Sequence, residues 1–301
     1  MDDFIRGTTG FVNPLIKWAG GKRRLLEILM PKYITPSFSE TATFYEPFAG
    51  SGVVSLNCGF NKIVMGDKNT RLMIFYEEVR DRPVKLHSKI ITYKKQFEMR
   101  HELKAKEIYY YRLRDEFNSI GITKIETAKN SGIKLSALFW ILNKTDFNGM
   151  YRETKNGEFN IPFGQRELPP LNYEDIDAVS IILNRSSLRQ GDFAEICRDV
   201  QKGDVVYLDP PYLPISKTAS FSTYLGKGFD IKEHQRLKKM MTNLSEKGAN
   251  VILSNSDCDL TRKIYKGMPG FKIDVVDVRR LISGNKKGRK IVKEIIMSNV
   301  R

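Results

Sequence analysis

The chain has 301 residues and a formal net charge of +15, from 50 lysines and arginines against 35 aspartates and glutamates. Its 41% hydrophobic content is ordinary for a globular protein, and no apolar run reaches the ~18 residues of a transmembrane helix, which excludes such a helix. The basic residues are spread along the chain, which favours a folded basic surface and a polyanionic partner such as nucleic acid.

Short apolar runs alternate with amphipathic stretches, which is the pattern of an α/β fold. The predicted helices are Arg23–Met30, a helix that begins near Val53, and Lys232–Lys247, which Gly248 is expected to end. The predicted strands, in chain order, are Thr43–Tyr45, Lys62–Gly66, Ser187–Gln190, Asp204–Leu208, Asn250–Ser254, Phe271–Val276 and Ile291–Met297.

The middle of the chain differs from the rest. Residues 80–150 carry long helical patterns with many charges and few strand signals, and residues 135–142 predict a buried helix. We therefore interpret 80–175 as a mostly helical insertion, and 1–79 together with 176–301 as the α/β domain that holds it.

Cysteine and histidine usage argues against disulfide and metal chemistry. The three cysteines form no CxxC pair, and the three histidines have no acidic or cysteine partners at metal-ligand spacing. The N-terminus, Met1-Asp2-Asp3-Phe4, lacks the basic and apolar pattern of a secretory signal. We therefore expect a cytoplasmic protein without a bound metal.

The most specific chemical signal is Asp209-Pro210-Pro211-Tyr212, which follows the apolar run 205–208. The Asp209 carboxylate and the Pro210 carbonyl can both accept hydrogen bonds from one exocyclic amino group. Each proline removes a backbone N–H and stiffens the turn, and Tyr212 offers a ring for a flat heterocycle. The arrangement suits a planar amine that attacks an electrophile, although a strand followed by a packed Pro-Pro turn is the structural alternative.

A glycine-rich turn indicates a nucleoside cofactor. Residues 44–52 (FYEPFAGSG) follow a strand, and Asp67, at the end of the next strand, can accept both hydroxyls of a ribose. The spacing matches neither GxGxxG nor a Walker loop, and Glu46 repels a pyrophosphate but can hold an ammonium group. S-adenosylmethionine satisfies both constraints, and its predicted contacts here are Glu46, Pro47, Phe48, Gly50, Gly52 and Asp67.

Two further segments are candidates for the same cofactor. In the Gly turn at 17–22 (KWAGGK), Trp18 and Lys22 can contact the methionine part, although Trp18 can equally be a core residue at a helix entry. In 191–193 (GDF), Asp192 can meet the adenine amino group and Phe193 can stack on its ring, or Asp192 can simply cap a helix.

Taken in order, these motifs resemble those of the Dam-like DNA adenine-N6 methyltransferases of the alpha arrangement. The matching segments cover nearly the whole chain: KWAGGK (17–22), YEPFAGSG (45–52), GDKN (66–69), NGEFNIPFG (156–164), DPPY (209–212) and LSNSD (253–257). The segment 156–164 is the narrowest of them and points to duplex DNA.

The resemblance implies a doubly wound, mostly parallel sheet with a helical target-recognition insertion, and methyl transfer to the N6 amino group of a flipped adenine at GATC or a related site. It implies S-adenosylmethionine contacts at Trp18, Lys22, Asp67 and Asp209. It implies DNA contacts at Lys17 and Phe147, at Asn148 and Met150 in the entry to a reading hairpin, and at Arg152 and Pro162.

The sequence departs from the family pattern in the reading segment. Glu153 and Thr154 follow Arg152 where relatives often have Tyr-Asn, and Arg166, a further candidate DNA contact, replaces a frequent aromatic. These departures affect the recognised site and leave the chemistry intact. A partner restriction nuclease is possible for such an enzyme.

Three alternatives stay open from the sequence. One is the same chemistry on RNA adenine or a protein amide, another is a DNA-binding regulator without turnover, and the third is a nicotinamide dehydrogenase. Ser254-Asn255 can border the target pocket or cap a helix. The loop 213–229 is a candidate cover for the flipped base, and 279–294 a candidate phosphate contact.

Overall fold

The computed structural model describes residues 10–121, 131–212, 229–279 and 291–300. The chain divides into two compact units. Unit 1 comprises Met1–Lys22, Ala49–Asn57 and Met65–Gly191, and unit 2 comprises Arg23–Phe48, Cys58–Val64 and Asp192–Arg301.

Within the described ranges, seven strands form a mixed sheet in the order β3-β2-β1-β4-β5-β7-β6. This confirms the predicted α/β class and all seven predicted strands, with small shifts at their ends. The strands are β1 (Thr43–Glu46), β2 (Lys62–Asp67), β3 (Ser186–Gln190), β4 (Val205–Leu208), β5 (Asn250–Ser256), β6 (Lys272–Arg279) and β7 (Ile291–Ser298).

The register of the central strands decides which residues meet at the sheet edge. β4 pairs in parallel with β1, Tyr45 opposite Val206, and with β5, Leu208 opposite Leu253, whereas β7 runs antiparallel to β5 and β6. Parallel strands end at the same edge, and the strand order reverses between β1 and β4. Open α/β sheets bind their ligands at such a reversal.

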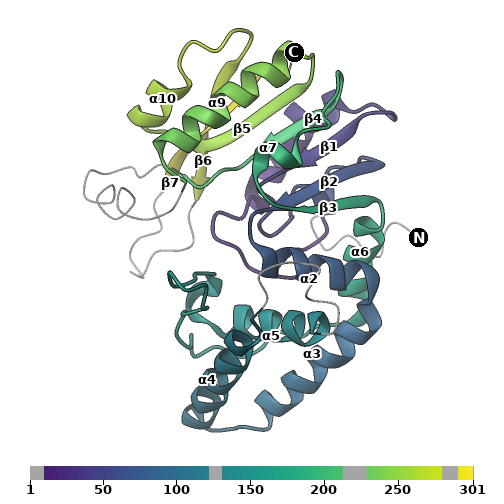
Figure 1. Ribbon diagram of the computed structural model, residues 1–301, viewed down its shortest axis with the longest axis vertical. Coiled ribbons are helices and arrows are strands. Elements are labelled where there is room, and N and C mark those ends of the chain that lie inside the picture. The colour runs from purple at the N-terminus through teal and green to yellow at the C-terminus, as the bar shows by residue number, and fades with distance from the viewer. Residues whose placement is uncertain (1–9, 122–130, 213–228, 280–290, 301) are drawn as a thin grey trace. The chain divides into compact units, whose positions relative to one another are not determined.

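The helix α9 (Ile231–Glu246) provides most of the helical cover in unit 2. Asp230 caps its start by accepting a hydrogen bond from the Glu233 amide at 3.0 Å, and Leu237, Met241 and Leu244 are buried. The helix ends before Gly248, whose φ is +84°. It packs on β5 and on α10 (Asp259–Tyr265) (Figure 1), so the predicted helix and its apolar face are confirmed.

The predicted helix Arg23–Met30 is present only in pieces. A 3-10 turn (Arg23–Leu25) leads into α1 (Leu26–Leu29), a π turn (Met30–Ile34) and a second 3-10 turn (Thr35–Ser37). Pro31 lies in the π turn, and proline has no backbone N–H with which to continue a regular α-helix.

The helices of unit 1 are α2 (Thr70–Asp81), α3 (Pro83–Glu98), α4 (Leu103–Ser119), α5 (Gly132–Thr145) and α6 (Tyr173–Leu183). The buried helix predicted at 135–142 is confirmed as α5, which packs against α2, α3 and α4 (Figure 1). Residues 80–175 are thus rich in helix, and their division from the rest as an insertion stays a prediction. No helix in the described ranges has the length and apolarity to cross a membrane.

The helix predicted near Val53 is wrong: only the 3-10 turn Ser55–Asn57 follows the glycine-rich segment. The side chain of Asn57 donates through Nδ2 to the Val53 carbonyl at 2.8 Å and to the Val12 carbonyl at 3.1 Å. The Val53 carbonyl is one that a longer helix needs. Gly59, with φ +79°, then turns the chain toward β2.

Substitution of Gly50 by alanine tests how tightly the glycine-rich turn is packed. A Cβ atom there would lie 2.5 Å from Trp18 Cδ1, whereas a Cβ at Gly59 meets nothing within 4 Å, and both residues have positive φ. We expect Gly59→Ala to cost only the ~1–2 kcal/mol of a left-handed alanine. Gly50→Ala should cost an additional ~1–3 kcal/mol of overpacking and change tryptophan emission. Thermal unfolding and fluorescence measure both, and equal losses with unchanged emission would contradict this packing.

Candidate active site

In unit 2, Asp209 directly follows β4 and is held by the neighbouring strand. Ser254 Oγ on β5 donates to Asp209 Oδ1 at 3.1 Å and is also hydrogen-bonded to Tyr207 Oη at 2.8 Å. Pro210 is buried and Pro211 is exposed. Ser254 and Asn255 lie inside β5, so the alternative that they cap a helix is wrong.

Tyr212 is fixed by a residue that the sequence analysis missed. Its hydroxyl donates to Glu294 Oε2 on β7 at 2.8 Å, and Glu294 is only 5% exposed. The available signal was a lone acid within the apolar strand 291–298, because a buried glutamate in such a strand needs a polar partner.

Three carboxylates act on the two tyrosines of this region. Burial and then Asp209 raise the pKa of Tyr212 well above its ordinary value, and Glu294 adds to the effect. The pKa of Tyr207 is raised in the same way by burial and Asp209, with further contributions from Glu46 and Glu294. Negative charges near a phenol disfavour its ionisation to the negative phenolate. The raised pKa values therefore indicate a negative field in this region, which favours positive charge.

Phe48 and Phe193, both predicted cofactor contacts, pack on each other. Their ring centroids lie 5.4 Å apart, and Phe229 completes the group at 5.5 Å from Phe48 and 5.8 Å from Phe193. Asp192 caps the short helix α7 (Phe193–Ile196) by accepting from the Ala194 amide at 3.0 Å. The capping interpretation of Asp192 is therefore confirmed, and its contact with adenine stays a prediction.

His234 is a buried neutral residue behind the Pro-Pro turn. Its Nδ1 is hydrogen-bonded to Tyr265 Oη at 2.9 Å, and its ring packs edge-on against Phe229 at 4.7 Å. Burial lowers the pKa of His234 to about 4, against the opposing effect of the Pro211 carbonyl. No pattern in the sequence indicates this environment, because the hydrogen-bond partner Tyr265 lies 31 residues after His234.

In unit 1, the glycine-rich turn and Asp67 form a second group. The Gly50 amide donates to Asp67 Oδ2 at 3.0 Å and the Asn69 amide to Oδ1 at 2.9 Å. Burial raises the pKa of Asp67, and these amides oppose the shift. Gly52 packs tightly too, because a Cβ there would lie 2.7 Å from Met65 Cε.

The upstream Gly turn belongs to the same group. Trp18 is only partly buried and lies on Gly50, so the alternative that it is a core residue is wrong. Lys22 is 5% exposed, and its Nζ donates to the Gly20 carbonyl at 2.6 Å. Unit 1 thus brings Trp18, Gly50 and Asp67 into one group, with Gly52 in the same turn as Gly50, whereas the contact of Lys22 is with Gly20 in its own turn.

Lys17 and Trp18 are attached to the predicted reading segment. The Lys17 amide donates to Asn143 Oδ1, and Asn143 Nδ2 donates to the Lys17 carbonyl, both at 2.8 Å. The Lys17 stem covers Gly149, where a Cβ would lie 2.5 Å from Lys17 Cδ. Trp18 stacks on Tyr151 with centroids 5.5 Å apart.

The reading segment itself is a hairpin. The Asn160 amide donates to the Arg152 carbonyl at 3.2 Å, and Arg152 Nε donates to Asn160 Oδ1 at 2.9 Å, which orients an exposed guanidinium. Arg166 Nη2 donates to Asn148 Oδ1 at 3.2 Å. Of the other predicted DNA contacts, Phe147 and Pro162 are exposed and Met150 is half-buried.

Asp146, at the base of the reading segment, is completely buried, and no donor in the described chain meets hydrogen-bond geometry with either of its carboxylate oxygens. Burial raises the pKa of Asp146 to about 8, whereas the Gly149 and Met150 amides and the charges of Lys17 and Arg166 act in the other direction. A buried acid without partners is costly to ionise, so the folded protein keeps this one protonated below its raised pKa.

The loop 213–229 and the segment 279–294 lie mostly outside the described residues. Among the residues that are described, no three histidine, cysteine, aspartate or glutamate side chains are arranged to hold a metal ion.

The raised pKa of Asp146 predicts a pH-dependent stability. The folded state holds an extra proton between pH 3.8 and about 8, so stability falls as pH rises through this window and levels off above it. Asp146→Asn removes this loss, so the variant should gain stability relative to the parent between about pH 5 and about pH 9 in urea unfolding.

Asp274→Asn provides the control for Asp146→Asn. Hydrogen bonds from Tyr33 and Lys32 lower the pKa of Asp274, and the stability this gives is lost only as pH falls through that lowered value. The stability that Asp274→Asn loses should therefore be the same at about pH 5 and at about pH 9. If the stability difference between Asp146→Asn and the parent is also the same at the two pH values, Asp146 is not a buried, protonated acid.

Comparison with known proteins identifies the family. The family model of the D12 class N6 adenine-specific DNA methyltransferases matches residues 18–282. The chain is 32% identical to a type II methyltransferase of Lactococcus lactis subsp. cremoris, over 96% of this chain and 95% of that protein. It is 34% identical to a type II methyltransferase of Methanocaldococcus jannaschii (95% and 99% covered) and 32% identical to a DNA adenine methylase of Vibrio cholerae serotype O1 (93% and 94%). The resemblance inferred from the motifs is confirmed, and the chain belongs to the D12 class of N6 adenine-specific DNA methyltransferases.

Proposed function

We propose that this enzyme transfers a methyl group from S-adenosylmethionine to N6 of an adenine flipped out of double-stranded DNA, at GATC or a related short site. The observation that carries the proposal is the fixed pair of Asp209 and Tyr212. Asp209 is held by Ser254 at 3.1 Å, and Tyr212 by Glu294 at 2.8 Å. The Asp209 carboxylate can accept a hydrogen bond from the amino group of a flat ligand, while the nearby Tyr212 ring can stack on the ligand's face.

The residues fit the cofactor. S-adenosylmethionine, when bound, supplies a methyl group carried on a positively charged sulfur. The negative field of Glu46, Asp209 and Glu294 favours such a cation, and Asp67 offers a half-buried acceptor beside the glycine-rich turn. The contacts we propose are Trp18, Lys22, Glu46, Pro47, Phe48, Gly50, Gly52, Asp67, Asp192, Phe193 and Asp209.

Asp209 and the Pro210 carbonyl have a direct role in this proposal. The lone pair of the adenine amino nitrogen is delocalised into the ring, which makes it a poor nucleophile. By accepting its two hydrogens, the two oxygens favour a pyramidal nitrogen with the lone pair directed outward. Asp209 also stabilises the positive charge that develops on this nitrogen, so no separate base is needed before attack. The proton leaves readily once the nitrogen is cationic.

Tyr212 helps to offset the cost of extracting the base. Flipping an adenine costs a few kcal/mol of unstacking and unpairing, and stacking on an aromatic side chain returns ~1–3 kcal/mol. The hydrogen bond to Glu294 fixes the Tyr212 ring before the base arrives, so less side-chain entropy is lost on binding. Pro211 stiffens the turn between the acceptor and the ring.

For the DNA, we propose that the hairpin reads bases in the major groove. Arg152 is the main candidate, since an arginine can donate two hydrogen bonds to guanine, and its guanidinium is exposed and oriented by Asn160. Lys17, Phe147, Asn148, Met150, Pro162 and Arg166 complete the proposed contacts. Because Arg166 replaces a frequent aromatic and bonds Asn148, the recognised site can differ from GATC.

Two of the relatives carry the name type II methyltransferase. We therefore propose a restriction nuclease of the same site specificity as the functional partner of this enzyme. Methylation of one adenine in each strand of the site then protects the host DNA from that nuclease.

Asp209→Ala tests the chemistry. It removes one of the two acceptors, and we expect transfer of labelled methyl to duplex DNA to fall below a few per cent of the parent while thermal unfolding stays cooperative. Asp209→Asn keeps the shape but replaces the charge with an amide, and we expect it to fail as well. An Asp209→Ala enzyme that retains more activity than this would overturn the assignment.

The same assay separates the alternatives. Transfer to an RNA or a protein in preference to duplex DNA would identify a different substrate. Binding to DNA with steep salt dependence but no methyl transfer by the parent would indicate a regulator.

Arg152→Ala tests the reading hairpin. If Arg152 contacts guanine, its loss should reduce discrimination at one base pair by ~1–3 kcal/mol, roughly 5- to 150-fold in relative kcat/KM, and leave other positions unchanged. Sequencing of methylated positions in a duplex library measures this. A uniform loss across all sites would instead mark Arg152 as a phosphate contact.

A further inference from the structure

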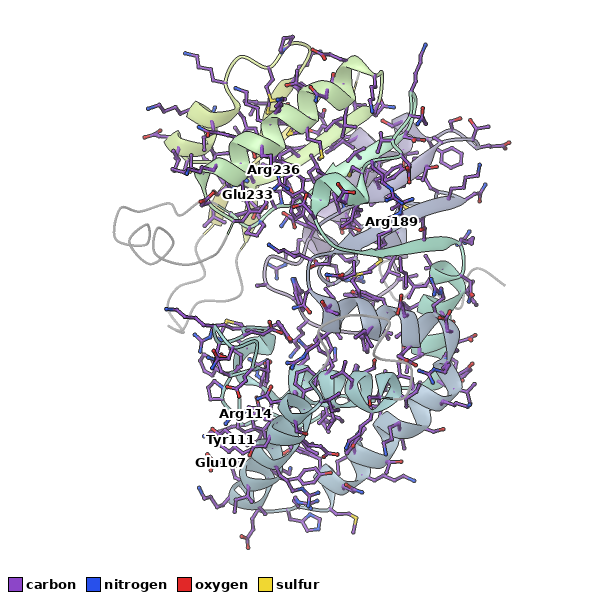
Figure 2. The ribbon with its side chains drawn as sticks, in the orientation of Figure 1. Glu107, Tyr111, Arg114, Arg189, Glu233 and Arg236 are labelled. Carbon is purple, nitrogen blue, oxygen red and sulfur yellow. The ribbon has the colours of Figure 1, made fainter. Side chains whose placement is uncertain are left out.

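In unit 2, Arg236 on α9 covers Phe193. The Arg236 guanidinium carbon lies 4.2 Å from the Phe193 ring centroid. Its Nη2 pairs with Asp192, the residue before Phe193, and its Nη1 donates to Glu233 Oε1 at 3.3 Å. Glu233 lies one turn before Arg236 on the same helix (Figure 2). Two carboxylates and an aromatic ring therefore hold one guanidinium in place.

This cover changes which surface Phe193 offers to a ligand. Phe193 is only 4% exposed, since Phe48 and Phe229 pack around it and Arg236 lies over its face. The Arg236 side chain, in contrast, is 44% exposed. A flat ligand that approaches Phe193 along this face meets the guanidinium before it meets the ring.

A fixed guanidinium is a suitable platform for a purine. It is planar and weakly hydrated, and nucleobases stack on arginine planes as they do on aromatic rings. Asp192 lies at its edge with a side chain 38% exposed, and a carboxylate there can accept from an exocyclic amino group. The surface therefore offers a stacking plane and an adjacent acceptor, which together match adenine.

We propose that Arg236, backed by Phe193 and held by Asp192 and Glu233, is the stacking platform for the adenine of the cofactor. This rests on the proposed use of S-adenosylmethionine, and it replaces direct stacking on Phe193 by stacking on the cation that covers it. Phe193 then acts through Arg236 and serves as a positioning residue.

The test measures ligand affinity without DNA. S-adenosylhomocysteine is titrated calorimetrically into the parent, Arg236→Ala and Arg236→Lys, and S-ribosylhomocysteine, which lacks the adenine, serves as the second ligand. We expect Arg236→Ala to weaken binding of the adenine-containing ligand about tenfold and to leave the affinity for the other unchanged. Arg236→Lys keeps the charge but not the plane, so it should restore little of the loss.

Arg262→Ala is the matched control. Arg262 is 46% exposed and pairs with Asp257, but no aromatic ring contact is found for it in the described chain, so its removal should not affect either ligand. An equal loss for both ligands in Arg236→Ala would show a merely structural role. Unchanged or tighter binding of S-adenosylhomocysteine would also overturn the platform, the latter because it would make Arg236 an obstacle.

The outcomes separate this inference from the proposed function. If the parent binds S-adenosylhomocysteine and methylates duplex DNA but Arg236→Ala behaves like the parent, only the platform is wrong. If the parent neither binds the ligand nor transfers a methyl group, the proposed function itself is wrong.

Discussion

The chemistry proposed for this enzyme depends on keeping several carboxylates close together at the carboxyl edge of one sheet. β1 ends with Glu46 and β4 is followed by Asp209, while Glu294 lies on β7. Such a cluster is unfavourable unless each acid has partners, and the structure supplies Ser254 for Asp209 and Tyr212 for Glu294. The remaining negative field is useful only to a ligand or a transition state that carries positive charge, which is what methyl transfer to an amine requires.

The region of unit 1 that we propose to read DNA shows the opposite electrostatic arrangement. Lys17 and Arg166 lie near Asp146, yet burial keeps that acid protonated up to a pKa of about 8. A neutral Asp146 does not cancel the positive charge that a phosphate or a guanine needs to meet. The cost is a buried carboxyl group that meets no hydrogen-bond donor in the described ranges, of the kind that persists where function rather than stability selects the residue.

Periodicity in the sequence was sufficient for the strands and for α5 and α9, because their burial patterns are local properties of the chain. It failed after Gly52, where the Asn57 side chain donates to the Val53 carbonyl, which a longer helix needs. Motifs located Asp209 and Tyr212, but not what holds them. Their partners Ser254 and Glu294 are 45 and 82 residues away in sequence, and the pairing of β5 with β4 and of β7 with β5 in the sheet brings them into contact.

Asp192 illustrates why a structural and a functional interpretation of one residue need not compete. The sequence offered either a helix cap or an adenine contact, and the structure has the cap, with Oδ1 accepting from Ala194 and Oδ2 paired with Arg236. An ionised carboxylate has about four acceptor positions, so these two interactions leave capacity for an amino group. The cap and the ion pair fix the orientation of the carboxylate before a ligand arrives, and a preorganised acceptor loses less entropy on binding than a mobile one. The same logic applies to Arg236, whose two carboxylate partners and aromatic support fix the plane on which a purine can rest.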